Sequence, residues 1–165
     1  MQDFVHLHVH TQYSLLDGQA SVARLVDKAM KNGMKGIAVT DHGNMFGIKE
    51  FTNYVNKKNS GPKGEVKDLK KRIAGIEAGT IECEDKEAEI AACKAKIVEA
   101  ENKLFKPIIG CEMYVARRTM DLKEGKPDQS GYHLIVLAKN ETGYHNLIKL
   151  VSHAWTRGYY RSEER

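Results

Sequence analysis

Cysteine is scarce in this sequence, and long apolar runs are missing. The 165 residues include three cysteines, an odd number, and none of them forms a C-x-x-C pair. A disulfide framework is therefore not expected, and a reducing, cytoplasmic compartment fits better. The first residues, MQDFVHLH, contain no basic stretch followed by an apolar one, and no other segment is apolar over the length of a bilayer crossing. We expect neither a signal peptide nor a membrane span.

Several enzyme signatures are absent as well. The sequence contains no phosphate-binding loop of the G-x-x-x-x-G-K-[ST] type and no G-x-G-x-x-G loop. Ser14 lies outside any G-x-S-x-G elbow, which argues against a serine hydrolase. Cys111 falls on the apolar side of a predicted strand, which favours a core position over a nucleophile. The net charge of +4 permits an anionic partner but is too small to indicate nucleic-acid binding by itself.

The first third of the chain alternates between strand and helix patterns. Apolar spacing predicts four elements in this part: strand 4–10, helix 22–31, strand 36–40 and helix 45–58. Ser21 and Asn44 are the expected N-caps of the two helices. Such alternation is typical of a parallel sheet covered by helices, in which functional sites are built from the loops that follow the strands. The fold class is therefore predicted to be α/β.

The middle of the chain has a different composition. The segment SGPKG at 60–64 is expected to break the chain, and residues 65–106 show apolar residues at spacings of three and four among dense charges of both signs. This pattern predicts two helices folded into an antiparallel hairpin with a narrow apolar seam. Two interpretations remain open, a protein-contact arm and a solvated helical insertion, and the charge density favours the second.

Strand and helix patterns return after Pro107. Residues 108–115 predict a strand with one wholly apolar face and with Glu112 on the other face. Residues 132–138 predict a further strand with His133 near its start, and 141–155 predict an amphipathic helix.

Histidines stand out at the start of the chain. His6, His8 and His10 alternate, so in a strand their side chains would share one face. Imidazole nitrogens and carboxylate oxygens are ligands for zinc, manganese or iron. We predict His8 and His10 as a ligand pair, and leave the role of His6 open. The other candidate ligands lie in or beside strand ends and their loops: Asp17, His42, Glu112 and His133. His145 and His153 lie on a helix without nearby partners and are not candidates.

These motifs resemble those of a known family. HLHVHTQYSLLDG resembles the first motif of the PHP (polymerase and histidinol phosphatase) family, and VTDHGNMFG resembles its second. IIGCEMYV and YHLIVLAKNETGYHNLIKLVSHA look like the later part of that domain, in the version found at the N-terminus of bacterial replicative DNA polymerases. The resemblance covers nearly the whole chain, except the helical hairpin and the last residues.

The resemblance implies a fold and a metal centre. PHP domains are irregular seven-stranded β/α barrels, of which residues 1–165 would form the N-terminal part, with 65–106 as an inserted helical hairpin. Up to three divalent ions, zinc or manganese with iron also possible, would lie at the carboxyl ends of the strands. Carried over residue by residue, the resemblance assigns His8 and His10 to one ion, Glu112 as a bridge between two, His133 to the second, and Asp17 with His42 to the third.

The resemblance also implies a choice of functions. Members that keep the metal cluster hydrolyse phosphoesters, and in polymerases a 3′–5′ exonuclease that proofreads DNA is implied. In other polymerases the domain is a non-catalytic platform that docks a separate proofreading exonuclease. An independent phosphatase acting on a small molecule is a third reading, which the polymerase-like motifs argue against. The expected partners are DNA and other replicase subunits, with no membrane.

The sequence departs from the family pattern in one respect. Family domains continue further and supply three more ligands, including a late Asp-x-His, which are missing here together with the carboxylates of a polymerase palm. We therefore expect a fragment of a longer protein, about half a barrel, whose last strand has an unpaired edge.

Overall fold

The computed structural model describes residues 4–129 and 131–159. Within these ranges the chain forms three strands and five α-helices and divides into two compact units. Residues Met1–Asn53 and Lys106–Arg165 make up the first, here called the sheet unit, and Tyr54–Phe105 make up the second, here called the hairpin unit. The mixed α/β architecture is the one expected from the sequence.

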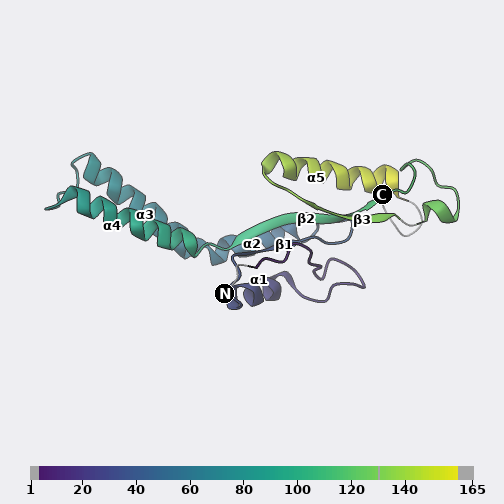
Figure 1. Ribbon diagram of the computed structural model, residues 1–165, viewed down its shortest axis with the longest axis horizontal. Coiled ribbons are helices and arrows are strands. Elements are labelled where there is room, and N and C mark those ends of the chain that lie inside the picture. Colours follow the sequence, from purple (N-terminus) through teal and green to yellow (C-terminus); the bar gives the residue numbers. More distant parts are fainter. Residues whose placement is uncertain (1–3, 130, 160–165) are drawn as a thin grey trace. The chain divides into compact units, whose positions relative to one another are not determined.

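The sheet unit is organised around one mixed three-stranded sheet, β1 (Gly36–Val39), β2 (Lys106–Val115) and β3 (Tyr132–Leu137), in that order (Figure 1). β1 and β2 are parallel, as predicted, and β1 is buried along its whole length. β3 is antiparallel to β2, so the parallel arrangement predicted from the first third of the chain does not extend to this strand. In the described part of the connection after β2, the one helical element is the short 3₁₀ turn Lys126–Asp128, and a parallel return needs a longer crossover.

The histidine-rich segment 4–10 is not a regular strand, which corrects a prediction. It follows β1 through two backbone hydrogen bonds, from Ala38 N to the carbonyl of His6 and from Thr40 N to the carbonyl of Val9, both 2.9 Å. Between these two hydrogen bonds the histidine-rich segment advances three residues, from His6 to Val9. The paired segment advances only two, from Ala38 to Thr40. One extra residue changes the face to which later side chains point. His6 is accordingly separated from His8 and His10 despite the even spacing.

Helix α1 (Val22–Lys31) begins where the sequence predicts. The Ser21 side chain accepts a hydrogen bond from Arg24 N, and Asn32 ends the helix. Helix α2 (Ile48–Lys58) begins three residues later than predicted. Asn44 does not cap it, because its side chain accepts from Phe46 N within the preceding turn and donates to two loop carbonyls.

Helix α5 (Glu141–His153) packs on the apolar face of β2. Its N-cap is Asn140, whose side chain accepts from Gly143 N at 2.9 Å. The core of this layer consists of four buried residues, Cys111, Met113, Leu147 and Ala154. In Figure 1, α5 lies above the strands and α1 below them. Cys111 is fully buried, in agreement with its predicted core position.

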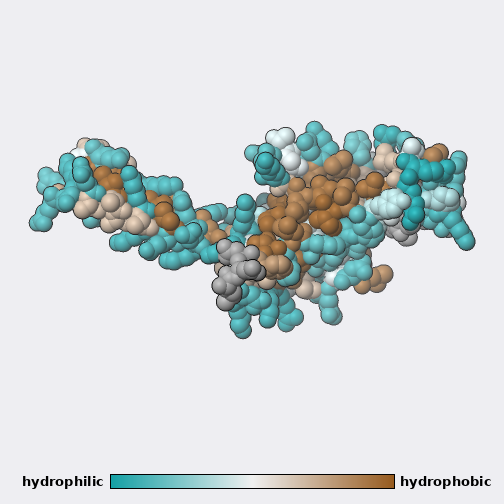
Figure 2. Space-filling model, viewed as in Figure 1, coloured by the Kyte–Doolittle hydropathy of each residue, from teal (hydrophilic) through white to brown (hydrophobic). Residues whose placement is uncertain are grey.

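The open edge of the sheet is β3. Within the described residues it pairs only with β2, and its Tyr132 and Leu134 side chains remain 60% and 52% exposed. Figure 2 shows hydrophobic residues gathered over α5 and the neighbouring strands. This arrangement agrees with the unpaired edge that the sequence predicts.

The hairpin unit contains α3 (Ser60–Glu77) and α4 (Lys86–Asn102), packed side by side. The predicted break at 60–64 is wrong, because α3 starts directly after Asn59 and Pro62 falls in its first turn, where a missing N–H costs nothing. The seam between the helices is formed by buried Ile76, Cys93, Ile97 and Ala100. At the base of the unit, the Asn59 side chain donates to the carbonyl of Phe105 and accepts from its N–H, at 2.8 and 2.9 Å. None of the helices in the described part of the chain has the length and apolar character needed to cross a membrane.

Candidate metal centre

One buried carboxylate organises the candidate site. The Glu112 side chain is 3% exposed and lies on the face of β2 opposite the apolar core. Its Oε2 atom lies 2.8 Å from His8 Nε2 and 2.9 Å from His10 Nε2, and its Oε1 atom contacts His133 Nδ1. Three histidines from two distant parts of the sequence thus converge on a single acidic group.

The parallel ladder between β1 and β2 brings His42 to the same place. Beyond the end of β1 the pairing continues as a bridge between His42 and Glu112, with Glu112 N donating to Asp41 O at 3.1 Å and Gly43 N donating to Glu112 O at 2.8 Å. His42 Nδ1 consequently lies 3.6 Å from Glu112 Oε2. The loop after β1 therefore supplies a site residue, as expected for a parallel pair.

The antiparallel direction of β3 explains the position of His133. A residue near the start of a parallel strand would lie at the wrong end of the sheet for this site. In the observed register His133 pairs with Tyr114, and Glu112 pairs with Ile135. Because paired residues point to the same face and β2 residues two apart share a face, His133 is a diagonal neighbour of Glu112.

Asp17 contacts the site through an interaction of its carboxylate with the His42 ring. Its Oδ2 atom lies 3.0 Å from His42 Nε2, and the Asp17 side chain is 57% exposed. The loop that carries Asp17 is tight, since a Cβ at Gly18 would lie 1.9 Å from the Thr11 carbonyl oxygen. On the other side of the ring, the Tyr114 hydroxyl lies 3.1 Å from His42 Nδ1. The six predicted site residues are thus brought together, whereas His6 packs edge-on against Phe4 elsewhere.

Sequence reasoning missed a buried network that positions these residues. Asp41, 1% exposed, accepts hydrogen bonds from Thr11 N, Thr11 Oγ1 and Ser14 Oγ at 2.6, 2.8 and 2.7 Å. The Ser14 hydroxyl also lies 2.8 Å from His10 Nδ1 and accepts from His42 N at 3.1 Å. The available signal was the Asp41–His42 pair, one residue after the end of β1. Ser14 is thus a structural link between loops and not a hydrolase nucleophile.

This network fixes the tautomer of His10. Because the Ser14 hydroxyl donates its only proton to Asp41, the hydroxyl oxygen can only accept from His10 Nδ1. The Nε2 atom of neutral His10 then presents a lone pair to the centre, where His8 Nε2 lies 3.0 Å away. Nitrogen and oxygen lone pairs that converge at these distances suit a bound cation, and an imidazole whose far nitrogen is hydrogen-bonded is the usual form of a histidine ligand.

Local electrostatics favour the ligand forms of two donors, His10 and Glu112. Burial lowers the pKa of His10, and the neighbouring His42 lowers it further, so the neutral imidazole is favoured. Burial raises the pKa of Glu112, but hydrogen bonds from His8 and His133 and the charge of His42 outweigh this effect, and the net pKa lies below its ordinary value. Glu112 is therefore an anionic group beside the neutral imidazole of His10.

Among the residues that the structure describes, two groups of side chains could hold an ion. The first is His8, His10 and Glu112, and the second is His42, Glu112 and His133. Glu112 belongs to both, which fits the bridging role that the family resemblance implies. The second group joins His42 to His133, whereas the resemblance pairs His42 with Asp17. The mixed imidazole and carboxylate set suits zinc, manganese or iron.

Comparison with known proteins identifies the family. The PHP domain matches residues 6–98 and 88–165. DNA polymerase III subunit alpha of Borreliella burgdorferi is 40% identical over 160 residues, that of Treponema pallidum 40% over 158, and that of Aquifex aeolicus 32% over 165. These alignments cover 95–96% of this chain and 10% of each relative, so the chain spans about a tenth of the length of the relatives it matches. The domain match reaches from the histidine motif to the last residue, and the chain therefore belongs to the PHP domain family.

Proposed function

We propose that this chain is the N-terminal PHP segment of a replicative DNA polymerase alpha subunit, and that its Glu112 centre is a metal-dependent phosphoesterase with 3′–5′ exonuclease activity. The observation that carries the proposal is the convergence of His8, His10, His42 and His133 on one buried carboxylate. The similarity to polymerase subunits supports DNA as the substrate. In this proposal the three strands belong to an irregular barrel, residues 65–106 are a helical insertion, and replicase subunits are cytoplasmic partners.

Each residue has a distinct task in this proposal. Bound divalent ions, zinc or manganese, would activate water and neutralise phosphoryl oxygens. Glu112 provides the negative charge shared by the ions, and His8, His10 and His133 fill the remaining inner positions. Asp17 is exposed and hydrogen-bonded to His42, so it lies on the side open to a substrate. The side chains of Ser14 and Tyr114 hold the rings of His10 and His42 in place.

The first test is the metal content of the chain, purified without chelator and without a tag. We expect about one divalent ion or more per chain, lost in His10→Ala. His145→Ala is the matched control, because His145 is 63% exposed on α5 and its only ion-pair partner in the described chain is Glu141, outside the centre. Retention of metal in His10→Ala, or its loss in His145→Ala, contradicts the assignment.

The second test is cleavage of a 5′-labelled single-stranded oligonucleotide by the polymerase subunit that carries this sequence. We expect metal-dependent shortening from the 3′ end, abolished by His10→Ala and unchanged by His145→Ala. Metal binding without cleavage would instead support the non-catalytic platform that docks a separate exonuclease. Turnover of a free phosphomonoester in place of the oligonucleotide would support a small-molecule phosphatase.

A further inference from the structure

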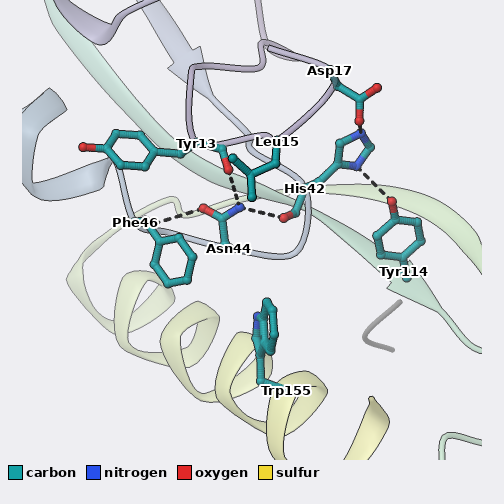
Figure 3. Close-up of a pocket in the computed structure, with 8 residues that line it drawn as sticks. All are labelled: Tyr13, Leu15, Asp17, His42, Asn44, Phe46, Tyr114 and Trp155. Carbon is teal, nitrogen blue, oxygen red and sulfur yellow. Dashed lines mark hydrogen bonds and ion pairs between the residues drawn. The ribbon is translucent and has the colours of Figure 1, made fainter. Parts of the chain in front are cut away.

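A cavity of about 230 Å³ adjoins the metal centre and shares Asp17 and His42 with it. Its walls include four aromatic rings, those of Tyr13, Phe46, Tyr114 and Trp155. Figure 3 shows Trp155 between Phe46 and Tyr114 in this view, with His42 and Asp17 at one end of the group. The cavity therefore has an aromatic body and a polar end that belongs to the candidate metal site.

Several apolar side chains that line the cavity are more exposed to solvent than residues of a hydrophobic core. Phe46 is 68% exposed, Trp155 45%, and Leu15, which also lines the cavity, 82%. These side chains surround one concave space, so they differ from isolated apolar residues on a surface. Their arrangement provides apolar area that a flat ligand can cover.

Two of the rings are held in place before any ligand arrives. The Trp155 indole N–H donates to Gly43 O at 2.8 Å, and the Tyr13 hydroxyl donates to Glu50 Oε2 at 2.9 Å. Asn44, at the back of the cavity, donates to Tyr13 O and His42 O and accepts from Phe46 N, so its side-chain groups are already used. A preformed site of this kind loses little entropy on binding, and its walls select for stacking over hydrogen bonding.

The geometry points to a nucleobase. We propose that the cavity between Phe46 and Trp155 is a stacking subsite for one unpaired base, whose nucleotide phosphate lies at the Asp17–His42 end. Aromatic side chains stack on any base, because every base has a π-face. The volume is below the roughly 300–1,000 Å³ of pockets that enclose a whole ligand, which fits one base with its sugar and phosphate outside. The inference rests on the proposed function for the position of the phosphate, and on the cavity alone for the base.

Trp155 is the one tryptophan in the sequence and lines the cavity, so its fluorescence can report on ligand binding there. Trp155 fluorescence is titrated with deoxyadenosine and with 2-deoxyribose on chelated protein, and with deoxyadenosine 5′-phosphate and 2-deoxyribose 5-phosphate on zinc-loaded protein. We expect the base-containing ligand of each pair to change the fluorescence and to bind at least about fivefold more tightly.

Phe46→Ala should remove most of that preference without altering the affinity for the sugar phosphate. Phe46→Leu, which keeps an apolar side chain, should also lose it, because stacking requires a ring. Phe4→Ala is the matched control, since Phe4 is 58% exposed and lies outside the cavity. Both Phe46 variants are expected to fold, because the ring is mostly in solvent, and circular dichroism checks this.

The outcomes separate this inference from the proposed function. Equal binding with and without the base, or a base preference that survives Phe46→Ala, overturns the subsite even if the polymerase subunit cleaves DNA. A base preference on chelated protein, lost in the Phe46 variants, supports the subsite even if no cleavage is found. A ligand effect that Phe4→Ala removes equally overturns it as well.

Discussion

At the scale of single residues, Ser14 links several parts of the candidate metal centre although it is not itself a candidate ligand. Its hydroxyl connects the Asp41 carboxylate to His10 Nδ1 and also accepts from the backbone of His42. Three segments that carry candidate ligands or their supports therefore meet at one oxygen. Groups that orient metal ligands in this way typically change metal affinity by 10–100-fold when they are removed.

Ser14→Ala tests this role. We expect the metal affinity of the chain to fall by about 10–100-fold, because His10 is no longer held in its ligand tautomer and Asp41 loses a donor. Competition with a chromogenic chelator measures the affinity. Ser152→Ala is the control, since its hydroxyl donates to Ile148 O within α5, away from the candidate centre. An unchanged affinity in Ser14→Ala would show that the hydrogen bond does not orient His10.

At this scale, the sequence indicates which residues could form the candidate site but not the contacts that position them. Residue chemistry singles out His8, His10 and Glu112, which converge, because imidazole and carboxylate groups near strand ends are recognisable without coordinates. His6 has the same chemistry and the same spacing, yet a backbone irregularity turns it away. Asp41 and Ser14 act through buried hydrogen bonds, and no spacing rule identifies such contacts.

At the scale of elements, local signals predict the helices better than the sheet. Ser21 caps α1 and α5 starts at Glu141, both as predicted, because helix starts depend largely on neighbouring residues, although Asn44 does not cap α2. The direction of β3 depends on how the chain returns from β2, which the pattern of the strand itself does not contain. The predicted break at 60–64 is wrong for a related reason, since glycine and proline are tolerated in the first turn of α3.

The seam of the hairpin unit gives a prediction at this scale. Ile76→Ala should destabilise the hairpin unit by about 2–5 kcal/mol, because Ile76 is fully buried against α4 and truncation leaves a cavity. Urea unfolding followed by circular dichroism measures the change. Val98→Ala, at a side chain that is 56% exposed on α4, should change stability by no more than about 0.5 kcal/mol. Equal effects of the two substitutions would contradict the observed seam.

At the scale of the whole molecule, the candidate metal centre lies in one of the two units and the helical pair in the other. All six candidate ligands lie outside Tyr54–Phe105, so the metal centre belongs to the sheet unit alone. The hairpin unit is closed at its base by the paired hydrogen bonds between Asn59 and Phe105. The chain therefore enters and leaves the helical pair at neighbouring points.

Replacement of residues 60–104 by a short Gly-Ser linker tests this division. We expect the metal content per chain to stay the same while the helical signal in circular dichroism falls. The linker only has to join two residues already in contact, and the entropy of closing a short loop is small. Adding His10→Ala to the shortened chain should abolish the metal content, as in the full chain. Loss of metal in the shortened chain alone would show that the hairpin unit supports the centre.

The shared position of Glu112 has a consequence for how such a centre can be lost over evolution. Substitution of any one histidine disturbs one of the two ligand groups, but substitution of Glu112 removes the common member of both. A single codon change at this position could therefore silence the whole centre, while the opposite face of β2 keeps its packing against α5. Among related polymerase subunits, the residue at this position is thus the first to inspect when metal-dependent lineages are separated from those that retain only the scaffold.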